Sequence, residues 1–125
     1  MRSWKLGELD LKSRLPEILS SSDAARAIVL DLAAGEALGD HEVHERAWMV
    51  VVSGDVEVST GTGEPAEGGA GLFVELAPGE RHEVVARSDA RLLLLLTPWP
   101  GGGHPGAMTI TEKLYVRRHA AKRAA

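Results

Sequence analysis

The chain has 125 residues, of which 44% are hydrophobic and 26% charged, which supports one hydrophobic core and excludes two independent domains. Its 14 basic and 18 acidic residues give a net charge of −4, which argues against wholesale binding to nucleic-acid phosphates. The absence of cysteine excludes disulfides, thiolate metal sites and cysteine nucleophiles, so a metal ion must have histidine or oxygen ligands.

No stretch of the sequence predicts insertion into a membrane. The longest uninterrupted apolar run, Leu92 to Leu96, falls far short of the roughly 20 residues that a membrane-spanning helix needs. Residues Met1 to Asp10 carry charges where a signal peptide would need an apolar segment. We therefore expect a cytoplasmic protein with no membrane contact.

The N-terminal region predicts a short helix followed by the first core strand. Pro16 after Ser13 suits the first turn of a helix that continues through Leu19. A polar break at residues 20–23 follows, and Arg26 to Leu32 is rich in aliphatic and β-branched residues at strand length. We expect residues 1–25 to form an N-terminal extension.

The next part of the sequence predicts a hairpin. Ala34 to Glu36 and then Gly39-Asp40 are turn-forming segments. Trp48 to Ser53 and Asp55 to Thr60 are two short apolar or alternating runs on either side of Gly54. These features indicate two strands joined by a tight turn.

Turns and strands alternate through the second half of the chain. Gly61 to Gly71 holds five glycines and a proline, which predicts an exposed loop. Strands are expected at Leu72 to Leu76, His82 to Ala86 and Arg91 to Thr97, with a tight turn at Ala77 to Glu80. Short strands at this spacing, without a long helical pattern, predict an all-β fold that is closed or sandwiched.

The last strand should end at Pro98, with residues 99–125 as a C-terminal extension. The tail from Lys113 carries five of the fourteen basic residues, which indicates a solvated segment or a contact with an acidic partner or a dimer mate. The five consecutive leucines at 92–96 would leave half of their side chains exposed on a half-solvated sheet. We therefore expect burial on both faces, by sheet packing or by a partner.

Five histidines, at positions 41, 44, 82, 104 and 119, are the natural candidates for metal ligation or proton transfer. His41 and His44 are expected to begin one strand and His82 another, and strand starts can converge on one mouth of a small barrel. Strand alternation places residues i and i+3 on opposite faces, so His41 and His44 share a cavity only through a bulge or an irregular entry turn.

Two segments of the sequence match a pair of known motifs. In the first, Gly35, His41 and Gly54 fall at the expected spacing, while Val43 and Ala47 occupy the places of a second His and a Glu. On these residues the chain resembles the cupin superfamily over roughly Arg26 to Pro98.

The second cupin motif is also recognisable. Gly71, Gly79 and His82 fit it, whereas Ala77 stands for its Pro and Ala86 for its Asn. The resemblance implies a cupin-type jelly-roll β-barrel in a single domain, with residues 26–98 as its core. It also suggests a homodimer.

The resemblance implies a metal site inside the barrel, although only His41 and His82 fall at ligand positions of the motifs. The third ligand we expect is His44, with Glu42, Glu45 or His104 as the alternatives. Such a site suits a divalent zinc, copper, iron or nickel ion with open positions for a small-molecule ligand. The implied function is a metal-dependent enzyme such as a dioxygenase or isomerase; the alternative is a metal-free small-molecule-binding or sensor module.

Other side chains are candidates for the cavity and the core. An arginine inside the barrel would mark a carboxylate or phosphate ligand, and the candidates are Arg26, Arg46 and Arg81. Four large side chains are expected to pack: Trp48, Trp99, Met49 and Phe73.

Overall fold

The computed structural model describes residues 1–11, 15–41 and 45–98, and for residues 40 and 41 it describes the backbone alone. The described chain folds into nine strands and one turn of 3-10 helix. The elements are η1 (Leu6–Glu8), β1 (Glu17–Ser21), β2 (Arg26–Leu32), β3 (Ala37–His41), β4 (Arg46–Ser53), β5 (Val56–Ser59), β6 (Ala66–Gly68), β7 (Phe73–Leu76), β8 (His82–Ala86) and β9 (Ala90–Thr97). None of the described helical segments has the length and hydropathy of a membrane span.

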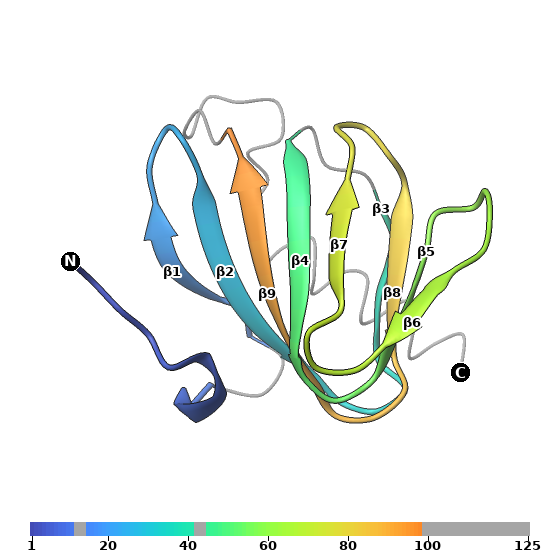
Figure 1. The fold of residues 1–125 in the computed structure, drawn as a ribbon, viewed down its shortest axis with the longest axis horizontal. Helices are drawn as coiled ribbons and strands as arrows, with labels where there is room; N and C mark the ends of the chain where they lie inside the picture. The colour runs from blue at the N-terminus through green and yellow to red at the C-terminus, as the bar shows by residue number, and fades with distance from the viewer. Residues whose placement is uncertain (12–14, 42–44, 99–125) are drawn as a thin grey trace.

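The strands form two antiparallel sheets, shown in Figure 1. One sheet has five strands in the order β1-β2-β9-β4-β7, and the other has four in the order β3-β8-β5-β6. The chain changes sheet at every connection except those between β1 and β2 and between β5 and β6. The all-β, jelly-roll architecture expected from the sequence is thus confirmed. The hairpin predicted around Gly54 is wrong, because β4 and β5 lie in different sheets.

The core lies between the two sheets. Alternation along β9 turns Leu92, Leu94 and Leu96 inward, each at most 6% exposed, while Leu93 and Leu95 lie half-buried on the outer face. Met49 is 1% exposed, as predicted. Full burial of one such side chain contributes roughly 1.5–3 kcal/mol, so these alternating strands supply the main stabilising term.

The predicted helix from Pro16 through Leu19 is wrong, because residues 17–19 lie in strand β1. Ile18 pairs with Ile28 of β2, and the register shifts between Ile18 and Ser20. Pairing along the edge of an existing strand outweighs a weak local preference for helix.

Two further strands were not predicted. β3 contains Gly39 and Asp40, which the sequence analysis assigned to a turn, so His41 ends a strand and does not begin one. Gly39 fits there because a Cβ at its position would lie 3.3 Å from Oε2 of Glu83 on the neighbouring strand. β6 lies within the glycine-rich segment 61–71, where it extends the sheet by pairing with β5.

Phe73 was predicted to be a core residue, and this is wrong. Alternation along β7 turns Phe73 outward, where 61% of it is exposed, and buries Leu76 at 2%. The Phe73 ring stacks on that of Trp48 with centroids 5.7 Å apart, so the packing role of Trp48 is confirmed on the outer face of the five-stranded sheet.

Candidate functional site

His82 is a buried polar residue at one end of the barrel. We call this end, where β3 ends and β8 begins, the mouth; it is the upper end in Figure 1. The turn before β8 is closed by a hydrogen bond from the Glu80 amide to the Ala77 carbonyl, at 3.0 Å, and by one from the Ala77 amide to the Glu80 carboxylate. The turn places His82 at the start of β8, where only 3% of the residue is exposed.

The surroundings of His82 favour the neutral imidazole. Burial lowers the pKa of His82, against a smaller opposing effect of the Glu80 carbonyl and carboxylate. Nδ1 lies 3.3 Å from the Glu80 carbonyl oxygen, which is a hydrogen bond when Nδ1 carries the proton. In that tautomer Nε2 is the nitrogen with a lone pair.

His41 is the backbone partner of His82. The two residues are opposite each other across β3 and β8, after a register shift between Leu38 and His41. The register shift that the structure describes lies before His41, whereas the bulge that His44 would need falls outside the described residues. This register shift brings the candidate histidines of the two sequence motifs to neighbouring positions at the mouth.

The other predicted ligands are only partly described. His44, Glu42, His104, and also His119 and Trp99, lie outside the described residues. Glu45 directly precedes β4, which begins at the mouth, and is 2% exposed. Among the residues that the structure describes, no group of three His, Asp or Glu side chains is arranged to hold a metal ion.

A cavity of about 300 Å³ opens at the mouth. The described residues that line it are Ser59, Thr60, Gly61, Arg81, His82 and Glu83. Of the three arginines considered from the sequence, Arg81 therefore lies at the cavity. Arg46 pairs with Glu75 on the outer face, at 2.9 Å, and Arg26 donates to the Ser21 hydroxyl.

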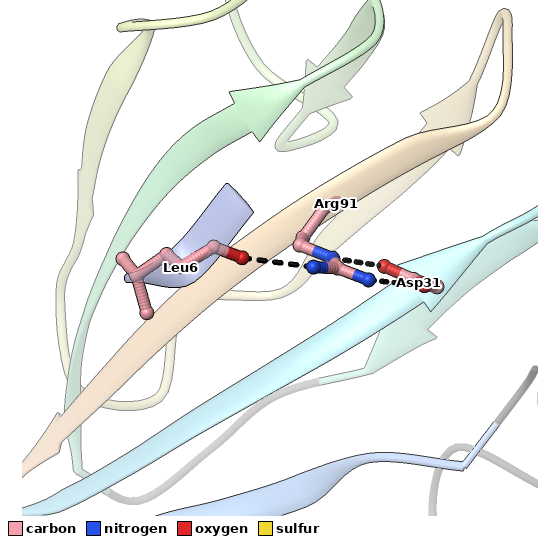
Figure 2. Close-up of polar contacts among 3 residues, drawn as sticks. All are labelled: Leu6, Asp31 and Arg91. Atoms are coloured by element: carbon pink, nitrogen blue, oxygen red, sulfur yellow. Dashed lines mark hydrogen bonds and ion pairs between the residues drawn. The ribbon is translucent and has the colours of Figure 1, made fainter. Parts of the chain in front are cut away.

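A polar cluster that was not predicted from the sequence lies at the opposite end of the barrel. Arg91 donates to both carboxylate oxygens of Asp31, at 2.7 and 3.0 Å, and to the Leu6 carbonyl at 2.8 Å (Figure 2). The hydrogen bond with Asp31 raises the pKa of Arg91. Asp31 and Arg91 line a second cavity, of about 340 Å³, with Gly7, Ser53 and Asp89 among its other lining residues. The feature of the sequence that could have revealed this cluster is one charged residue within each of two apolar strands, Asp31 in β2 and Arg91 in β9.

No protein-family model and no curated protein matches the sequence. Solved structures do resemble it. An RmlC-like cupin protein from Desulfovibrio desulfuricans is 20% identical with a TM-score of 0.70, over 78% of this chain and 97% of that one. An uncharacterized conserved protein with a double-stranded β-helix domain from Klebsiella pneumoniae is 18% identical with a TM-score of 0.67, over 81% and 94%.

A cupin superfamily protein from Desulfitobacterium hafniense gives the same result, at 12% identity and a TM-score of 0.66 over 74% of this chain and 86% of that one. At these identities the likeness concerns the fold. The strand order, the two antiparallel sheets and these neighbours agree with the two sequence motifs, so the chain has the double-stranded β-helix fold of the cupin superfamily.

Proposed function

We propose that this small cupin binds a divalent transition metal ion (zinc, copper, iron or nickel) at the mouth through His41, His44 and His82. With the ion bound, the protein would be an enzyme, such as a dioxygenase or an isomerase, that acts on a small molecule held in the barrel. The observation that carries this proposal is the pairing of His41 with His82 across β3 and β8, next to a cavity.

The donor set fits a borderline transition metal. A metal ion binds the neutral imidazole, and burial already lowers the pKa of His82, so a proton competes weakly for its ring. A hydrogen bond from Nδ1 to the Glu80 carbonyl would fix the tautomer and leave Nε2 as the ligating atom. We favour His44 as the third ligand; Glu45 is the alternative that its burial supports, beside Glu42 and His104.

A metal with open coordination positions supplies polarisation of a bound ligand or a lowered pKa of bound water. The chain's own contribution is to hold the imidazoles in place and to bind the ligand in the polar cavity beside them. The inward leucines beneath the mouth exclude water from the barrel interior.

The alternative function is a metal-free small-molecule-binding or sensor cupin without catalysis. It is favoured by Val43 and Ala47, which stand where the motif has a second His and a Glu. Two imidazoles alone make a weak site for a divalent ion.

Elemental analysis of untagged, purified protein separates the two functions. After incubation with each of the four ions and desalting, we expect close to one equivalent of one metal per chain, and its loss in His82→Gln. His119→Gln is the matched control, since it changes a histidine of the basic tail. His44→Ala and Glu45→Gln then identify the third ligand. Wild-type protein that retains none of the four ions would favour the metal-free alternative.

We further propose that the protein is a cytoplasmic homodimer. The support for a dimer is a group of large apolar side chains on the outer face of the five-stranded sheet, namely Trp48, Phe73, Leu93 and Leu95. The cytoplasm is the default compartment for a chain of this composition, and fractionation of cells that make the protein tests it.

A further inference from the structure

The cavity at the mouth has an unusual lining for a small-molecule site. Ligand pockets are mostly apolar with a few polar groups. Here none of the described lining residues is hydrophobic: beside His82 there are one guanidinium, one carboxylate, two hydroxyls and the backbone of Gly61. An apolar ligand would bury these groups without hydrogen bonds, at a cost in binding free energy.

Two segments set this lining in place. Ser59 ends β5 and pairs with Glu83 of β8, so a hydroxyl and a carboxylate come from neighbouring strands. Thr60 donates its hydroxyl proton to the Thr62 carbonyl at 2.9 Å, which leaves the Thr60 oxygen as an acceptor. At Gly61 a Cβ would meet nothing within 4 Å, so the backbone there borders open space.

We propose that this cavity binds a small carboxylic acid that carries hydroxyl groups. Arg81 would bind the carboxylate, because the guanidinium fork matches two carboxylate oxygens. An ionised Glu83 carboxylate can only accept hydrogen bonds, so it requires donors on the ligand. The Ser59 hydroxyl can donate or accept. A small acid with one carboxylate and several hydroxyl groups offers an acceptor to Arg81 and hydrogen-bond donors to Glu83. The inference rests on the proposed small-molecule function of the mouth and adds the class of the molecule.

The size of the cavity suits a small ligand. A volume of about 300 Å³ equals the share of about ten water molecules in the liquid, at about 30 Å³ each. This volume lies at the lower end of the range for ligand pockets. A small molecule of the size of a six-carbon acid therefore fits within the cavity.

Three probes separate the two chemical requirements: D-gluconate has a carboxylate and hydroxyls, D-sorbitol has the same hydroxylated carbon chain without the carboxylate, and hexanoate has the carboxylate without the hydroxyls. By titration calorimetry we expect saturable binding of D-gluconate, with the other two at least about tenfold weaker. Loss of a charge-assisted hydrogen-bond pair in Arg81→Gln should weaken D-gluconate binding about ten- to a hundredfold. Ser59→Ala, which removes only a neutral hydroxyl, should weaken it less.

Arg87→Gln is the control, since Arg87 follows the other end of β8 and pairs there with Glu57 and Glu67. It should leave D-gluconate affinity unchanged. Metal content is measured on the same samples, and Arg81→Gln should retain it. Protein that holds metal but binds none of the three probes, or binds them equally, overturns this inference and leaves the metal proposal standing. Protein without metal that still selects D-gluconate supports the inference and removes the metal proposal.

Discussion

The pair of Arg91 and Asp31 is predicted to stabilise the fold far more than an ordinary surface ion pair. The perturbation is Arg91→Gln, which keeps an extended polar side chain but removes the charge and the two-pronged contact with Asp31 (Figure 2). It also removes the hydrogen bond to the Leu6 carbonyl, which ties the η1 turn to β9.

The expected cost follows from the exposure of the two side chains. A hydrogen bond to a charged group contributes about 1.5–3 kcal/mol when it is shielded from water. The Arg91 and Asp31 side chains are 14% and 30% exposed, so solvent screens the pair in part. We expect a loss of about 2 kcal/mol in the free energy of unfolding, which for a chain of this size lowers Tm by roughly 6–10 °C.

A double-mutant cycle in urea measures the interaction itself. Arg91→Gln combined with Asp31→Asn should give a coupling energy of about 1–2 kcal/mol. The control cycle uses Arg46 and Glu75, which also form a hydrogen-bonded pair at 2.9 Å but are 41% and 46% exposed, and whose coupling should not exceed about 0.5 kcal/mol. Equal coupling energies in the two cycles would refute the argument from burial.

Three further predictions concern a turn, a titration and an interface. Gly54→Ala should lower the free energy of unfolding by more than about 3 kcal/mol, because its Cβ would lie 2.1 Å from the Asp89 carbonyl oxygen. Gly35→Ala, with a similar positive φ but open space around the Cβ, should lower it by about 1 kcal/mol. Similar shifts in Tm for the two variants would contradict this. In metal-free protein, burial lowers the pKa of His82 below that of the unfolded chain, so stability should be full above about pH 6.5 and fall as the pH drops below it. Urea unfolding at a series of pH values should show a shallower fall in His82→Gln, and identical slopes would argue against this origin. Gel filtration at micromolar concentration should show a dimer that becomes a monomer in Phe73→Glu; a monomeric wild type removes the proposed interface.

The elements that the sequence predicted well are those in which alternation and turn chemistry agree. Arg26–Leu32 and His82–Ala86 were expected with the bounds that the structure gives, because each is bounded by turn-forming residues. The strands that were missed owe their form to a partner. Ile18 is extended because it pairs with Ile28, and β6 exists because β5 offers an edge, which no local pattern reveals.

The residues of the candidate site also fall into those that local sequence predicts and those that only the strand register brings together. Motif spacing identified His41 and His82, but their direct pairing depends on the register shift in β3, which the sequence does not encode locally. Arg91 and Asp31 are 60 residues apart, and only the register of β2 against β9 makes them neighbours. Sequence reasoning finds residue types suited to a site, whereas the strand register decides which of them meet.

The proposed ligand site and a set of hydrogen-bonded connections lie at opposite ends of the barrel, and this separation makes the binding experiments interpretable. At the end opposite the mouth, the connections are held by hydrogen bonds from the Ala34 amide to Asp89, from the Asp55 amide to Ser88, and from the Arg87 amide to the Asp55 carbonyl. None of these residues lines the mouth cavity. Since Arg81 is exposed at the mouth and belongs neither to the core nor to those hydrogen bonds, we expect Arg81→Gln to leave both intact. A loss of D-gluconate binding at an unchanged free energy of unfolding would therefore report a lost ligand contact, whereas a parallel loss of both would identify Arg81 as a residue that stabilises the fold.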